Sequence, residues 1–241
     1  MFFYSPMEAY VIYPIFSLNF VINNVIFYLL FAALLTILLG KGISKGSIIS
    51  NNWGILSESL FRSILLKIEN VAGPKMSIYL PLFYSIFNLV LFSNLLGLVP
   101  YSTTPTVELV ITLSIAFTLL MGLLLLGFLT HKLYLLGIFI PGGTPLGLVP
   151  LLVLLEIIAY IFRTISLGLR LAINLITGHL LLKVSIGFVW LGYIKGTSFF
   201  ILAIPLILLT VFLSLEILIA YLQAYILVFI TIITLKDVSM N

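Results

Sequence analysis

The sequence has no cysteine and only two histidines, His131 and His179. A chain without cysteine forms no disulfides, no thiolate metal sites and no iron–sulfur clusters. A bis-histidine haem would require both histidines on facing helices, and no second pair exists for a two-haem quinone enzyme. We therefore expect neither a cofactor nor a bound metal.

Charged residues are also scarce, at 7% of the chain, whereas an average soluble domain contains about 25%. Hydrophobic residues make up 63%. The 11 basic and 7 acidic residues are too few and too scattered to form a nucleic-acid surface. This composition predicts an integral membrane protein surrounded by lipid, with no nucleic-acid partner.

The N-terminal segment has no lysine or arginine before Lys41. It therefore matches neither a basic signal peptide nor an arginine-rich transit peptide. If the protein is mitochondrial, we expect it to be made inside the organelle. The hydrophobicity of the chain agrees with this, because such chains are hard to import.

Long apolar runs predict membrane-spanning helices. A helix needs about 20 residues to cross about 30 Å of hydrocarbon, whereas a β-barrel would show alternating segments of about ten residues. Five runs are long enough to span: 20–39, 79–99, 107–130, 145–184 and 199–235. The expected fold class is an all-α integral membrane protein, with residues 1–241 forming a single membrane domain.

Residues 53–69 differ from these runs because they are amphipathic. Apolar residues recur at four-residue spacing, and charged residues lie elsewhere around the helix: Leu56, Leu60, Ile64 and Ile68 against Glu58, Arg62 and Glu69. This pattern predicts a helix lying in the membrane interface. The alternative is an ordinary surface helix packed on a partner subunit.

The last two runs are too long for ordinary spans. Residues 145–184 would form a helix of about 60 Å, twice the thickness of the hydrocarbon layer, and an ordinary tilt of about 20° would not accommodate it. Either each run contains a poorly marked turn, or both are long, strongly tilted helices. We favour a tilted hairpin that turns within the segment Tyr193–Ser198.

Arg170 lies inside the first of these long runs. A charged side chain within a membrane costs from about 2.5 to more than about 10 kcal/mol and indicates a functional site. Arginine does not readily lose its proton to avoid this cost. Because Arg170 is far from both ends of the run, its side chain cannot easily reach water.

The polar residues of this run form a stripe. At 100° per residue, five of them lie within about 40° of one direction: Glu156, Arg163, Arg170, Asn174 and Thr177. Three others point the opposite way and suit close packing or a water-filled crevice: Gly168, Ala172 and His179. Arg163 could instead reach the interface or pair with a neighbouring carboxylate, and Glu156 could be an end-of-span carboxylate near water.

The final run carries Glu216 and Gln223, which are seven residues apart and therefore share a helix face. A glutamate within the membrane needs a partner. In an antiparallel hairpin, level residues have a constant index sum. Pairing Glu216 with His179, and Gln223 with Arg170, gives sums that agree to within two and centres the turn near residue 197.

With these residues assembled, the chain resembles subunit a of F-type ATP synthases in its mitochondrial form, over nearly its whole length. The segment Ser166–His179 carries the resemblance most strongly, and Asn94–Pro100 supports it. Bacterial members typically have glutamate where this chain has His179, and histidine where it has Glu216. This exchange is typical of the mitochondrial branch.

The resemblance implies a non-catalytic, proton-translocating subunit of the Fo sector, in the mitochondrial inner membrane, beside a ring of c subunits, a peripheral stalk and other Fo subunits. Arg170 would be the essential arginine between two aqueous half-channels. His179 and Glu216 would line the proton entry, and Glu156 the exit. The remaining positions would tune or hydrate the site: Arg163, Asn174 and Gln223.

Three other functions remain possible from the sequence. A secondary transporter would favour internal repeats and broken helices, and no convincing repeat is found between the halves. A purely structural subunit of a respiratory complex would leave Arg170, Glu156, Glu216 and His179 as unexplained buried charges. A rotor driven by sodium instead of protons is a closer variant.

Overall fold

The computed structural model describes residues 14–17, 21–44, 52–98, 105–132, 146–196 and 199–239. Six α-helices account for most of them: α1 (Asn24–Ser44), α2 (Asn52–Ala72), α3 (Leu80–Gly97), α4 (Leu109–His131), α6 (Val149–Ile194) and α7 (Phe199–Ser239). Short 3₁₀ segments precede three of these helices: η2 (Pro74–Tyr79), η3 (Pro105–Val107) and η5 (Leu146–Leu148). The expected all-α membrane class is confirmed.

One short antiparallel pair of strands departs from this pattern. β1 (Pro14–Ser17) pairs with β2 (Val21–Asn23), and α1 begins directly afterwards at Asn24. The expected helix at 20–39 therefore starts later than predicted and continues to Ser44. Asparagine is favoured at helix N-termini, which fits a helix start at Asn23 and Asn24 and not at the first apolar residue.

Four helical stretches among the described residues are long and apolar enough to cross a membrane: Pro74–Gly97, Leu109–Thr130, Val149–Ile194 and Ala203–Asp237. The apolar part of α1, Val25–Gly40, is shorter. The prediction of about five membrane helices thus has four clear members.

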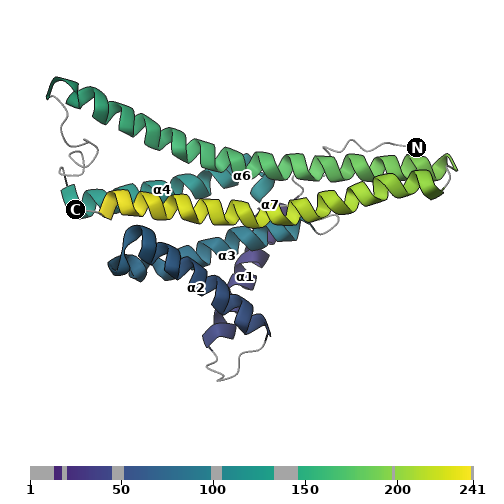
Figure 1. The fold of residues 1–241 in the computed structure, drawn as a ribbon, viewed down its shortest axis with the longest axis horizontal. Helices are drawn as coiled ribbons and strands as arrows, with labels where there is room; N and C mark the ends of the chain where they lie inside the picture. The colour runs from purple at the N-terminus through teal and green to yellow at the C-terminus, as the bar shows by residue number, and fades with distance from the viewer. Residues whose placement is uncertain are drawn as a thin grey trace.

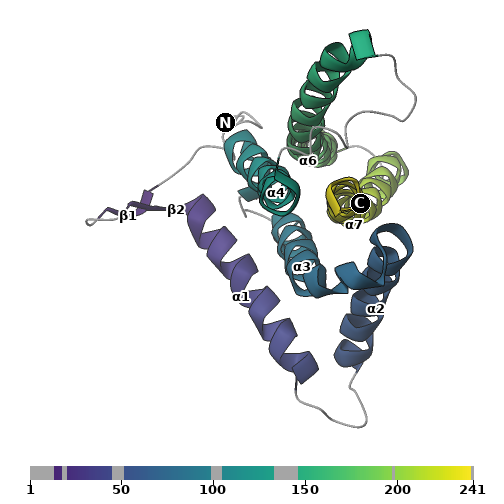
Figure 2. The same ribbon diagram turned by 90° about the vertical axis from the view of Figure 1, so that its left-hand side faces the viewer.

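The two long helices are continuous. α6 has 46 residues, a length of about 69 Å at 1.5 Å per residue, so no hidden turn divides it. It ends ten residues later than the predicted position 184. Figure 1 shows α6 and α7 running side by side along the longest axis, joined at one end. Figure 2, seen along that axis, shows α7 nearly end-on, with the N-terminal half of α6 rising obliquely away from it and α1 lying across this direction.

The turn between α6 and α7 begins within the predicted segment. The N–H of Lys195 donates to the carbonyl of Leu191 (3.1 Å), and the N–H of Gly196 donates to that of Tyr193 (3.1 Å). Gly196 has a φ of 63°, a left-handed conformation that glycine adopts at little cost and that commonly ends helices. Thr197 and Ser198, the rest of the predicted turn, lie outside the described residues.

The apolar core lies where α2, α3, α4, α6 and α7 meet, and its largest buried side chains include Phe83, Phe87, Leu120, Leu175 and Leu227. The far end of the hairpin is different. Most apolar side chains between positions 204 and 222 of α7 are exposed. The hairpin therefore offers a long apolar surface that the described part of the chain does not cover.

The amphipathic helix predicted at 53–69 is α2. Its charged residues Glu58, Arg62 and Glu69 are exposed, whereas Ile64 and Ile68 are buried in the core with α3 and α7. Ile64 and Ile68 on the apolar face of α2 thus pack on this chain, whereas Leu56 on the same predicted face is exposed. The position of α2 relative to a membrane surface stays a prediction.

Candidate functional site

Arg170 is exposed on α6. The buried face of α6 lies to one side of it and contacts α4 and α7: Tyr160, Thr164, Leu167, Leu171 and Leu175. Among the described residues, no carboxylate lies within the 4.0 Å ion-pair distance of its guanidinium. Arg170 is therefore a permanent charge whose counter-charge must come from elsewhere.

His179 and Glu216 are brought together as the hairpin register predicts. His179 Nδ1 lies 3.2 Å from Glu216 Oε1, and the two side chains are only 13% and 4% exposed. The approach is short enough for an ion pair, but its angles do not make a hydrogen bond. Three buried atoms thus lack a hydrogen-bond partner in the described structure: His179 Nε2, Glu216 Oε1 and Glu216 Oε2.

Such buried polar atoms are rare in stable proteins unless water or a ligand satisfies them. The pair is therefore suited to receiving and passing on a proton or a water molecule. Lys183 lies one helical turn beyond His179 on α6 and adds a positive charge near the His179–Glu216 pair. This end of the hairpin is where α7 is most exposed.

Gly178 explains how Glu216 comes so close to α6. A Cβ atom at position 178 would lie 3.1 Å from Glu216 Oε1 and 3.2 Å from its Cδ. Glycine thus lets the carboxylate approach the α6 backbone more closely than a residue with a Cβ atom would allow without a shift of the Glu216 side chain. Gly168 acts similarly toward α4, because a Cβ there would lie 3.0 Å from Leu113 Cα. Of the small face predicted from Gly168, Ala172 and His179, Gly168 and Ala172 are buried, which agrees with the expected close packing.

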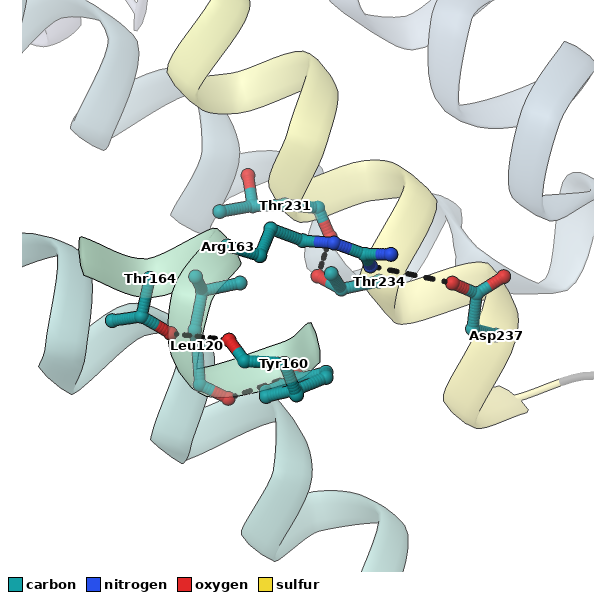
Figure 3. A network of polar contacts seen from close by, with 7 residues as sticks. All are labelled: Leu120, Tyr160, Arg163, Thr164, Thr231, Thr234 and Asp237. Atoms are coloured by element: carbon teal, nitrogen blue, oxygen red, sulfur yellow. Dashed lines mark hydrogen bonds and ion pairs between the residues drawn. The ribbon is translucent and has the colours of Figure 1, made fainter. Parts of the chain in front are cut away.

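Arg163 pairs with Asp237, near the end of α7. The atoms Arg163 Nη1 and Asp237 Oδ2 are 3.7 Å apart, with side chains 35% and 49% exposed. The guanidinium also lies 6.0 Å from the centre of the Tyr160 ring, and the Tyr160 hydroxyl donates to the carbonyl of Leu120 (3.1 Å). Figure 3 shows Arg163 extending from α6 toward Thr234 and Asp237 on α7.

Sequence reasoning foresaw that Arg163 could pair with a carboxylate but did not identify Asp237. The signal was available. The indices of Arg163 and Asp237 sum to 400, five more than those of His179 and Glu216, so the hairpin brings the two residues to the same region without making them level. Asp237 was missed because the final helix was expected to end at 235 and instead continues to Ser239.

The other predicted residues do not join one cluster. Glu156 and Asn174 are half-buried on α6, and Gln223 is buried on α7. No hydrogen bond joins Gln223 to Arg170 among the described residues, so that suggested pairing is not seen. Near Gln223, the amide of Asn94 donates to the carbonyl of Ala220 (3.3 Å), linking α3 to α7.

The polar residues of the site are therefore spaced along α6 and do not form a compact cluster. Arg170 is nine residues from His179, which corresponds to about 14 Å, and fourteen residues from Glu156, which corresponds to about 21 Å. One proton-binding group thus lies on each side of the arginine, too far away to contact it. No group of three or more potential metal ligands occurs in the described residues.

Comparison with known proteins adds a consistent set of relatives. The sequence model of the family "ATP synthase A chain" matches residues 21–236. A protein named ATP synthase subunit a from Emericella nidulans is 39% identical, over 98% of this chain and 96% of its own length. The protein of that name from Podospora anserina is 40% identical, over 92% and 85%. The protein of that name from Chondrus crispus is 36% identical, over 97% of this chain and 95% of its own length.

Proposed function

The chain belongs to the ATP synthase subunit a family, and we propose that Arg170 is the residue through which it couples proton flow to the rotation of a c-subunit ring. As a member of this family it is a multi-pass membrane protein and the non-catalytic, proton-translocating stator subunit of the Fo sector. It works with other subunits of the ATP synthase.

The exposure of Arg170 is the observation that carries the proposal. An arginine that no carboxylate of the described chain neutralises attracts an ionised carboxylate on a moving partner. Two unit charges about 4 Å apart interact by about 4 kcal/mol at an effective dielectric constant of 20, whereas a protonated carboxyl group gains far less. A ring carboxylate would therefore release its proton on reaching Arg170 and bind another after passing it.

The spacing along α6 gives the two halves of the proton path. His179 and Glu216, close together and incompletely hydrogen-bonded, would line the entry from the intermembrane space. Glu156, on the other side of Arg170, would line the exit toward the matrix. The positive charge between them would block a direct proton path, so that protons must travel on the ring. Asn174 and Gln223 would hydrate the site, and Arg163 would tune its charge.

The shape of the hairpin supports a position beside a ring. α6 and α7 lie crosswise to α1 (Figure 2), so a bilayer that α1 crosses steeply would hold the hairpin close to its plane. The uncovered apolar surface of the hairpin would then face the ring on one side and lipid on the other. We place the protein in the mitochondrial inner membrane, encoded in the organelle, with the peripheral stalk among its partners.

Substitution of Arg170 tests this function. In the intact ATP synthase, Arg170→Ala should leave the complex assembled and abolish proton-driven ATP synthesis by inner-membrane vesicles. Arg62→Ala is a matched control, because Arg62 is an exposed arginine on α2 and should be dispensable. Synthesis that continued in the Arg170→Ala complex would contradict the role given to this residue. Synthesis driven by a sodium gradient alone would favour the sodium rotor.

A further inference from the structure

We propose that Asp237 is a positioning residue that holds Arg163 away from the ring-facing side of α6, so that Arg170 is the arginine that ring carboxylates meet. The inference rests on the proposed function. It concerns Arg163, the second arginine of the same stripe, and says what keeps its charge from competing with that of Arg170.

The two arginines share a face of α6. They are seven residues apart, which corresponds to about 10 Å along a helix and to nearly the same direction around it. Arginine keeps its charge in such surroundings. If both guanidinium groups were equally accessible, a ring carboxylate leaving Arg170 would meet a second cation of equal attraction. The second cation would hold the ionised carboxylate and delay its protonation.

The structure treats the two arginines differently. Arg170 is exposed and has no carboxylate within ion-pair distance among the described residues. Arg163 is half-buried and 3.7 Å from Asp237. Its guanidinium also lies over the ring of Tyr160, which is itself fixed by its hydrogen bond to Leu120. Figure 3 shows the side chain turned toward α7. Two independent contacts thus hold it on the side of the hairpin partner.

The alternative, that the Arg163–Asp237 ion pair serves only as a clamp that stabilises the packing of α6 on α7, explains these contacts less well. An ion pair as exposed as this one contributes little to stability. Asp237 also lies in the last turn of α7, where a negative charge interacts unfavourably with the helix dipole. The nearby Lys236 offers the helix end a more favourable charge. The position of Asp237 is better explained by the charge of Arg163 that it neutralises.

The test uses the intact ATP synthase and compares rates per assembled complex. Asp237→Asn keeps the size of the side chain and removes its charge, which releases Arg163. We expect proton-driven ATP synthesis to slow several-fold, while Asp237→Glu keeps the wild-type rate. Adding Arg163→Gln to Asp237→Asn should raise the rate again several-fold, because the released cation is then gone. Glu69→Gln, which removes an exposed carboxylate on α2, controls for a general loss of negative charge.

A double variant as slow as Asp237→Asn alone would overturn the proposal, because a clamp that has lost one partner gains nothing from losing the other. An unchanged rate in Asp237→Asn would overturn it as well. Neither result would touch the proposed function, which fails separately if Arg170→Ala still supports synthesis.

Discussion

Replacing Gly178 by alanine places a methyl group against the buried carboxylate of Glu216. The added Cβ would lie 3.1 Å from Oε1, 3.2 Å from Cδ and 3.4 Å from Cγ, and the two carbon–carbon distances are shorter than the roughly 3.5–4.0 Å of an ordinary contact between carbon atoms. Glu216 is only 4% exposed, so its side chain cannot simply swing into solvent. The carboxylate must move by a few tenths of an ångström, and its 3.2 Å approach to His179 changes with it.

The expected effect on stability is small, because two contributions oppose each other. Overpacking a well-packed site costs about 1–3 kcal/mol, whereas alanine in place of glycine within a helix stabilises it by about 1 kcal/mol. The complex should therefore assemble. If the overpacking energy falls on the proton-transfer step, the rate of that step drops about 5-fold to about 150-fold, at 1.36 kcal/mol per factor of ten.

The assay is proton-driven ATP synthesis by inner-membrane vesicles at a fixed proton-motive force, expressed per assembled complex. Gly187→Ala is the matched control, because Gly187 lies on the same helix with nothing within 4 Å of an added Cβ. It makes the same gain in helix propensity without touching the pair. Equal rates in Gly178→Ala and Gly187→Ala would refute the reasoning that the close approach of Glu216 to α6 matters for proton entry.

Two further predictions concern the same face of α6. The double variant His179→Ala with Glu216→Ala should slow passive proton flux through Fo, because it removes both groups of the buried pair; unchanged flux would exclude them from the proton path. Gly168→Ala should lower the stability of the complex by about 1–3 kcal/mol relative to Gly122→Ala, because its Cβ would lie 3.0 Å from the backbone of Leu113. Gly122→Ala on α4 should not lower the stability, because an added Cβ there has nothing within 4 Å. Equal stability of the two variants would show that α4 can shift freely.

Hydrophobicity and helical periodicity were sufficient to predict most of the architecture. A chain with 63% hydrophobic residues must bury its backbone polar groups in helices when it lies in lipid, so long apolar runs become long helices. The pairing of His179 with Glu216 was predicted because a glutamate within the membrane needs a partner, and its index sum was consistent with a turn near residue 197. It was confirmed at 3.2 Å.

Other features depended on contacts that no local pattern encodes. The apolar residues Ile64 and Ile68 predicted an amphipathic helix, but only the packing of α2 on α3 and α7 decided what they face. The strand β2 replaced the expected helix start because its pairing with β1 outweighed local helix preference. Gln223 proved buried without a hydrogen bond to Arg170 among the described residues, although the register alone placed the two level.

The order of charges along the hairpin was determined by the sequence by itself, because a continuous helix converts residue spacing directly into distance and direction. That order puts Arg170 between His179 and Glu156. Which charges are neutralised was decided only by the tertiary structure, because an ion pair depends on what a neighbouring helix brings within a few ångströms. α7 brings Asp237 to Arg163 and Glu216 to His179, whereas no carboxylate of the described residues lies within ion-pair distance of Arg170.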